Sequence, residues 1–79
     1  MDFETTISQN DFKIPIIVIY ENPRDYPGKL VARLFDRSTP TPYVALADTM
    51  EDIRSTIPLS MICLRRQFDD DPCIAEVWI

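Results

Sequence analysis

The feature that most constrains this chain is an imbalance between strand patterns and helix patterns. Five segments have the composition of β-strands, whereas one short segment, residues 48–57, has the spacing of a helix. A five-stranded sheet has two faces, and a helix of about three turns covers only part of one of them. We therefore expect an α+β fold with a mainly antiparallel sheet of four to five strands, one short helix on one face, and the order β-β-β-α-β-β. The expected strands are residues 13–20, 29–36, 43–47, 61–66 and 73–79.

The segment from Lys13 to Tyr20, K-I-P-I-I-V-I-Y, is the strongest strand pattern in the chain. It is β-branched and apolar at odd and even positions alike, which is typical of a central strand that is buried on both faces. Pro15 is compatible with a strand because it lies near the end of the segment. We expect the hydrophobic core to contain Ile16, Ile17, Val18, Ile19, Leu30, Leu34, Val44, Leu46, Ile53, Ile57, Leu64, Val77 and Trp78.

The period of the apolar residues changes from two to 3.6 after the third strand. Asp48 is a good N-cap residue, and Glu51 three positions later completes a pattern like a capping box. Apolar residues at 50, 53 and 57 then fall on one side of a helix, and Pro58 ends it. Because so short a helix is marginal alone, it must pack against the sheet.

The first twelve residues differ in composition from the rest. They contain three acids and no base, and the whole chain of 79 residues has a net charge of −5. We expect residues 1–12 to be a polar, acidic tail that is mobile or orders on a partner, and residues 13–79 to be a single small domain. The chain has neither a transmembrane pattern nor a signal-peptide pattern, so we expect a cytoplasmic protein with no membrane contact.

The side chains available for catalysis are few. There is no histidine, which removes the commonest general acid–base and the commonest zinc ligand. Glycine-rich phosphate loops and nucleophile elbows are also missing. We therefore expect a protein that is not an enzyme and needs no cofactor.

Two small clusters have alternative interpretations. Asp69, Asp70 and Asp71 offer oxygen ligands for a divalent cation, but their spacing is not that of a calcium loop, and a solvated connector between strands is the favoured interpretation. Cys63 and Cys73 flank this connector and are expected to be buried thiols, because a six-residue loop does not place them opposite each other.

A run of basic residues follows the second expected strand and its flanks, with tyrosines nearby. In one interpretation it forms a stripe that binds phosphate or RNA, with aromatic stacking. In the other, the bases form ion pairs with Glu21, Asp25, Asp36 or Glu76. The residues of this candidate stripe are Arg24, Lys29, Arg33, Arg37, Tyr26 and Tyr43.

Residues 13–57 resemble the HicB-like antitoxin domain. The resemblance rests on K-I-P-I-I-V-I-Y as a first strand, K-L-V-A-R-L-F-D as a second, and A-D-T-M-E-D-I-R as a junction between strand and helix. It implies a sheet with one helix, and a protein that assembles into oligomers and neutralises a small RNA-cleaving toxin. The chain departs from that family's pattern because it lacks a Pro-Gly-Cys turn before the third strand, has a shorter helix and ends in a strand instead of a DNA-binding segment.

The uncovered sheet face, the apolar last strand and the missing catalytic residues point to one leading hypothesis. The chain is expected to be a small protein-interaction module that binds a second copy of itself, as a homodimer, or another protein through a sheet face. The alternative is a nucleic-acid-binding accessory protein that uses the basic stripe.

Overall fold

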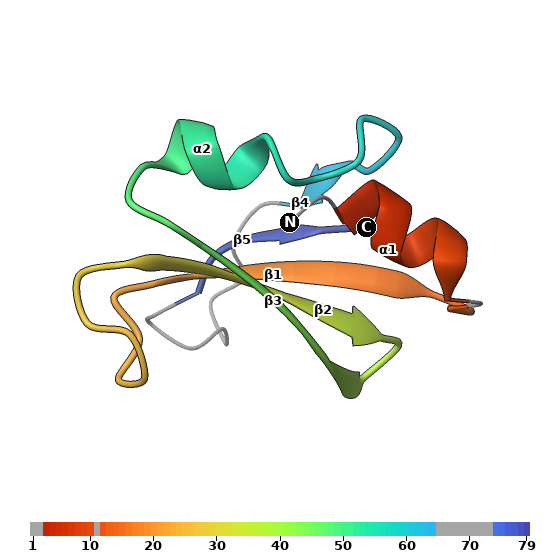
Figure 1. The fold of residues 1–79 in the computed structure, drawn as a ribbon, viewed down its shortest axis with the longest axis horizontal. Helices are drawn as coiled ribbons and strands as arrows, with labels where there is room; N and C mark the ends of the chain where they lie inside the picture. Colours follow the sequence, from red (N-terminus) through yellow and green to blue (C-terminus); the bar gives the residue numbers. More distant parts are fainter. Residues whose placement is uncertain (1–2, 11, 65–73) are drawn as a thin grey trace.

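The computed structural model describes residues 3–10, 12–64 and 74–79. These residues form an α+β fold in which a five-stranded antiparallel sheet packs against two short helices (Figure 1), so the predicted fold class is confirmed. The strands lie in the order β3-β2-β1-β5-β4. In chain order the elements are α1 (Phe3–Gln9), β1 (Pro15–Glu21), β2 (Leu30–Asp36), β3 (Thr39–Ala47), α2 (Met50–Arg54), β4 (Cys63–Leu64) and β5 (Ile74–Trp78).

The central strand is β1, as its apolar sequence predicts, but it is not buried on both faces. Ile17 and Ile19 are fully buried, whereas the predicted core residues Ile16 and Val18 are only partly buried and lie outside the core. The strand β1 pairs with β2 on one side, from Pro15 opposite Asp36 to Glu21 opposite Leu30, and with β5 on the other. The β1–β2 loop turns on two residues with positive φ, Asn22 and Gly28. The Asn22 side-chain oxygen accepts a hydrogen bond from the N–H of Gly28 at 2.7 Å, which closes the loop. Glycine suits that turn because it has no Cβ to oppose a left-handed backbone.

The helix α2 is shorter than predicted, and its N-cap is a different residue. Thr49 has an extended backbone, and its hydroxyl accepts a hydrogen bond from the N–H of Asp52 at 3.2 Å. The predicted N-cap, Asp48, instead forms an ion pair with Lys29. The α-helix ends at Arg54, and the chain continues in tighter turns, with the Ile57 N–H bonded to the Arg54 carbonyl.

Part of the segment predicted to be a tail is folded. Residues 3–9 form α1, so the described domain contains two helices where the sequence analysis expected one. Phe3 is fully buried, and its N–H donates to the Thr56 carbonyl at 3.0 Å. Ile7, four residues later and hence on the same side of the helix, packs against the core as well. Two apolar residues one turn apart are therefore enough to hold this polar helix on the domain.

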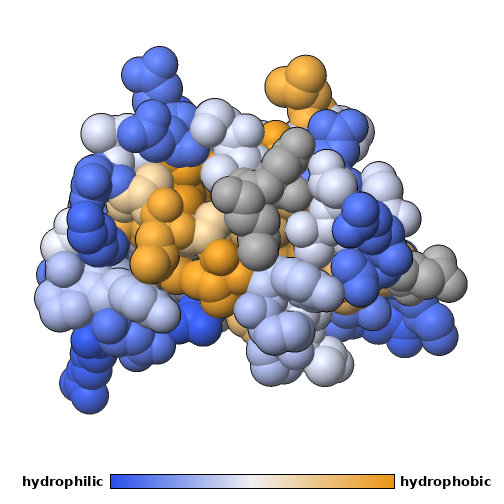
Figure 2. Space-filling model, in the orientation of Figure 1, coloured by the Kyte–Doolittle hydropathy of each residue, from blue (hydrophilic) through white to orange (hydrophobic). Residues whose placement is uncertain are grey.

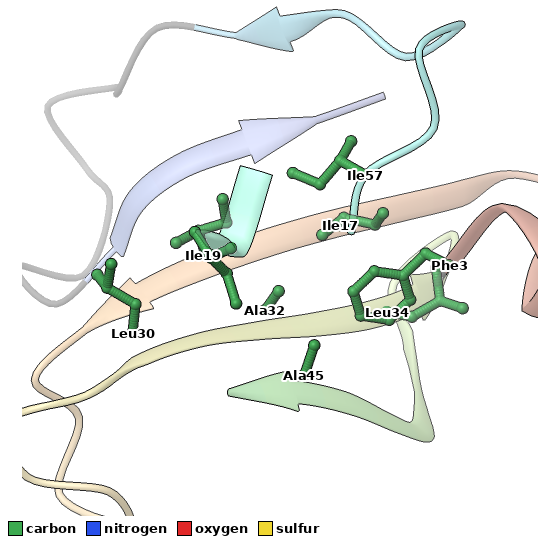
Figure 3. Close-up of a cluster of buried hydrophobic side chains, with 9 residues drawn as sticks. Phe3, Ile17, Ile19, Leu30, Ala32, Leu34, Ala45 and Ile57 are labelled. Atoms are coloured by element: carbon green, nitrogen blue, oxygen red, sulfur yellow. The ribbon is translucent and has the colours of Figure 1, made fainter. Parts of the chain in front are cut away.

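The core lies on one side of the sheet, between the strands and the helices (Figure 3). Six predicted core residues are buried there: Ile17, Ile19, Leu30, Leu34, Ile53 and Ile57. Phe3, Ala32 and Ala45 join them without having been predicted. Two predicted core residues are instead exposed, Leu46 at 50% and Leu64 at 40%. The reason is that both helices cover the same face, so alternate strand residues point to a face that no helix covers.

The boundaries of β1, β2 and the end of β5 are close to those predicted, whereas β3 begins at Thr39 and not at Tyr43. The strand predicted over residues 61–66 is seen as Cys63–Leu64, and the predicted residues 65–66 lie outside the described part of the chain. The strands β2 and β3 are joined by a two-residue turn in which Arg37 has a φ of 60°. Among the described residues, no helix is long and apolar enough to cross a membrane.

Candidate protein-interaction face

Strand register shows which side chains share the face opposite the helices, here called the open face. Directly paired residues in an antiparallel sheet point to the same side, and neighbours along a strand point to opposite sides. Val18 pairs with Arg33 and Val77, and neither Val18 nor its partners belong to the core cluster. Following this register across the sheet, and extending it by one residue from the Ile17–Trp78 pair to Ile16 and Ile79, gives three rows of open-face residues: Ile62, Ile79, Ile16, Phe35 and Pro40; Leu64, Val77, Val18, Arg33 and Val44; and Ile74, Tyr20, Val31 and Leu46.

The open face is almost entirely apolar. Arg33 is the one charged residue in the three rows. Seven large hydrophobic residues are exposed in the described part of the chain, and four of them lie in the three rows. They are Leu46, Ile62, Leu64 and Ile79, of which Ile62 is the most exposed at 67%. Leu46 lies on the β3 edge, whereas the other three adjoin one another at the β4 edge. Scattered exposed hydrophobics are ordinary, but a contiguous set such as that at the β4 edge marks a contact surface.

Arg33, in the middle row, forms an ion pair and lies near an aromatic ring. Its guanidinium lies 2.7 Å from the Asp25 carboxylate and 5.9 Å from the centre of the Tyr20 ring. Since Asp25 belongs to the β1–β2 loop, this ion pair brings the loop towards the open face. Val31, between Tyr20 and Leu46 in register, is fully buried although it lies outside the core cluster. The open face is thus closed at Val31, partly exposed along the middle strands, and exposed at Ile62, Leu64 and Ile79.

The structure does not bring the predicted basic stripe together as one surface. Arg33 is paired with Asp25, one of the carboxylates of the ion-pair interpretation. Lys29 is paired with Asp48, which that interpretation did not include. Arg24 lies exposed in the β1–β2 loop, and Arg37 lies exposed in the β2–β3 turn. Two of the four cations are therefore already neutralised.

The two tyrosines of that stripe are also separated. Tyr43 packs against the core on the helix side, with its ring edge-on to Phe12 at 6.1 Å and its hydroxyl bonded to Asn10 at 3.2 Å. Tyr26 is exposed in the β1–β2 loop. Tyr43 therefore lies on the opposite side of the sheet from Arg33.

A polar contact on the helix side joins α2 to β5. The Arg54 guanidinium donates two hydrogen bonds to the Glu76 carboxylate, one of them at 3.1 Å, and the Trp78 indole donates a third at 3.2 Å. The bond from Arg54 lowers the pKa of Glu76, partial burial raises it by less, and the bond from Trp78 lowers it again. These hydrogen bonds favour the ionised form of the Glu76 carboxylate. Through Arg54, the carboxylate links α2 to the sheet.

Cys63, in the edge strand β4, is exposed, so the prediction of a buried thiol is wrong for this residue. Partial desolvation raises the pKa of its thiol, the Glu76 carboxylate raises it further, and Arg54 lowers it. Cys63 is a free thiol, and Cys73 lies outside the described residues.

The candidate metal ligands Asp69, Asp70 and Asp71 also lie outside the described residues. Within residues 3–10, 12–64 and 74–79, no three His, Cys, Asp or Glu side chains gather in a way that could hold a metal ion. A shallow hollow of about 350 Å³ lies beside the Lys29–Asp48 pair, lined also by Glu21, Asn22 and Met50, and it contains no convergent set of reactive groups.

Comparison with protein-family models, curated proteins and solved structures finds no match to this chain. The resemblance of residues 13–57 to HicB-like antitoxins therefore stays a prediction. An uncovered face was predicted, but the residues that form it were not. The sequence does contain a clue, because the even-numbered residues of β1 are apolar as well as the odd-numbered ones. These even residues pair with odd residues of β2, which in turn pair with even residues of β3.

Proposed function

We propose that this protein is a non-enzymatic protein-interaction module whose open face is the contact surface for another protein. The observation that carries the proposal is the set of three apolar rows across five strands, on the side that neither helix covers. A two-layer fold buries one sheet face, and antiparallel sheets with a free second face ordinarily present polar residues there. This second face is apolar instead.

The size of the open face fits that role. Five strands at about 4.8 Å spacing and the two rows outside the row closed at Val31, about 7 Å apart, give a surface of roughly 24 by 14 Å, or about 340 Å² in projection. The largest apolar patch on an ordinary monomer is roughly 300–600 Å² and is often functional. The open face lies within that range.

Charge favours a foreign partner on this face over a second copy stacked face to face. The face itself is neutral, because Arg33 is paired with Asp25. The chain as a whole has a charge of −5, so two copies repel each other while a basic protein is attracted. The occupant we propose is an apolar protein surface on a partner of net positive charge.

Nucleic acid is the weaker alternative. Phosphate binding needs free cations arranged along a track. Lys29 and Arg33 are engaged by carboxylates, and Tyr43 lies on the other face. The apolar face is the more extensive feature, and it supports the protein-interaction proposal.

The test uses a photo-crosslinking amino acid at position 64, on the open face, and the same amino acid at position 59 as the control. Both native leucines are exposed, but Leu59 lies in the loop before β4 and on neither sheet face. In cells, a crosslinker at position 64 should trap a basic protein that position 59 does not trap. That protein, purified, should bind the chain, and Leu64→Lys should weaken its affinity at least about tenfold while Leu59→Lys does not. Equal crosslinking at both positions, or equal affinity of both variants, would contradict the proposal.

A further inference from the structure

The strand β3 forms one edge of the sheet, and hydrogen-bond alternation shows which of its backbone groups are unpaired. The N–H of Asn22 bonds to Lys29, and the N–H of Arg37 bonds to Ile14. Backbone hydrogen bonds recur at every second residue of an antiparallel pair. The odd residues of β2 therefore direct their N–H and C=O groups towards β1, and the even residues direct theirs towards β3. With Ala32 opposite Ala45, the odd residues of β3 point their N–H and C=O groups inwards, and its even residues point theirs outwards. The register shifts by two residues between Arg33 and Phe35, so this alternation is the same on both sides of the bulge that contains Pro42.

Two of the four outward positions are prolines. Pro40 and Pro42 have no N–H to offer, and this is the placement that an edge strand tolerates. The N-terminal half of the edge is thus protected from pairing. Val44 and Leu46 are the remaining outward residues, and together they present two N–H groups and two C=O groups.

A second copy of β3 fits this short edge with two-fold symmetry. If two β3 strands run antiparallel with Ala45 opposite Ala45 of the other copy, Val44 lies opposite Leu46 of the other copy on both sides of the axis. The four outward groups of each strand then pair, and four hydrogen bonds form with none left over. Shifting the register to pair Val44 with Pro42 also allows four hydrogen bonds, but every facing pair then contains a proline and leaves the C=O of Val44 or Leu46 without a donor. The prolines therefore favour the register centred on Ala45.

The side chains along the edge agree with this arrangement. From Thr39 to Ala47 the strand has no charged residue, so no local repulsion opposes pairing even in a chain of charge −5. Ala45 at the axis is small, which suits the close approach of the central pair. Leu46 is 50% exposed and would be covered by Val44 of the other copy. Figure 2 shows hydrophobic residues gathered in the middle of the molecule, between α2 and β3, framed by hydrophilic ones.

The pairing enlarges the apolar surface. A stable protein–protein interface needs about 800 Å² from each partner, and one open face offers about 340 Å². Pairing along β3 makes one ten-stranded sheet with both open faces on the same side, or about 700 Å², which approaches that size. We propose that two copies pair antiparallel along β3, centred on Ala45, and so join their open faces into one surface. The role of the joined surface rests on the proposed function, but the pairing does not.

The first test is solution mass against concentration, by sedimentation equilibrium. The wild-type mass should rise from the 9.2 kDa of one chain towards twice that value. Val44→Pro removes an outward N–H and should weaken dimerisation at least about tenfold, because each dimer loses two hydrogen bonds. Val44→Thr is the matched control, since it keeps the N–H and the β-branched shape. The native prolines at alternate positions show that the monomer accepts proline there, and a thermal melt checks that the variant is folded.

Hydrogen exchange supplies a second readout that does not depend on any variant. The Val44 and Leu46 amides should become protected as protein concentration rises, whereas the inward Ala45 and Ala47 amides should be protected at every concentration. A wild-type chain that stays at 9.2 kDa up to millimolar concentration, or a Val44→Pro variant that dimerises like the wild type, would overturn the inference. Leu64→Lys should leave the dimer intact, so failure of the partner proposal and failure of this one are distinguishable.

Discussion

Phe3 donates its backbone N–H to the carbonyl of Thr56 at 3.0 Å, and this bond joins the first described residue of the chain to the segment that follows α2. The Phe3 ring is fully buried among Ile17, Leu34 and the other core residues. The start of the chain is therefore a structural part of the domain, and α1 closes the core at the end that the five-residue α2 leaves uncovered.

Replacing Phe3 with alanine should lower the free energy of unfolding by about 3 kcal/mol, because a buried aromatic ring is lost and a cavity is left. In a domain of this size that loss is a large fraction of the total stability. Urea denaturation of the variant and of Thr5→Ala, an exposed position on the same helix, measures the difference. A Phe3→Ala curve that overlays the control would mean that α1 does not contribute to the core.

The sequence was sufficient to predict the sheet class and the central position of β1, because a strand that is apolar at odd and even positions alike is typical of the middle of a sheet. It could not predict α1. The first twelve residues contain only Phe3, Ile7 and Phe12 as large apolar residues after Met1, and their burial depends on a space created by tertiary packing. Composition alone reports a polar segment, and tertiary context overrides it.

The candidate site was predicted in outline only. Five strands and too few helices imply an uncovered face, but which alternate residues lie on it depends on the side where the helices pack. The predicted core accordingly mixed both faces, with Ile17 from the covered side and Leu46 from the open side. The Arg33–Asp25 ion pair was foreseen as one alternative, since opposite charges lay close in sequence, whereas the Lys29–Asp48 pair displaced the N-cap predicted for Asp48.

The N-cap assignment makes a prediction that separates two adjacent residues. Thr49→Ala removes the hydroxyl that accepts the Asp52 N–H and should cost about 1 kcal/mol of unfolding free energy. Asp48→Ala removes an exposed ion pair with Lys29 and should cost less, roughly 0.5 kcal/mol. Chemical denaturation of both variants at pH 7 shows which of them loses more unfolding free energy. A larger loss for Asp48→Ala would restore Asp48 as the cap.

The contact between Arg54 and Glu76 should make stability depend on pH. Because the pKa of Glu76 is lowered in the folded state, its ionised form stabilises the fold above the unfolded-state pKa of about 4.3, and this contribution is lost as the pH falls through the lower folded-state pKa. We expect Glu76→Gln to have a lower melting temperature than the wild type at pH 7 and the gap to narrow below about pH 4.

The matched control for that experiment is Glu21→Gln, which removes one carboxylate from an exposed position at the end of β1. Melting curves from pH 3 to pH 7 should show a larger gap to the wild type for Glu76→Gln than for Glu21→Gln. A Glu76→Gln gap that stays constant over the whole range would show that the ionised carboxylate is not what the contact stabilises.

Cys63 provides a chemical readout of the same contact, because the thiolate and not the thiol reacts with alkylating reagents. Partial desolvation and the Glu76 carboxylate raise the pKa of the Cys63 thiol, and the Arg54 guanidinium lowers it. In a Cys73→Ser background, Glu76→Gln should therefore speed the reaction of Cys63 with iodoacetamide at pH 7.5, and Arg54→Gln should slow it. A faster reaction in one variant and a slower reaction in the other would not result from loosening of the fold, because loosening would speed the reaction in both variants. Rates that rise in both variants would mean that local opening, and not the charges beside the thiol, controls its reactivity.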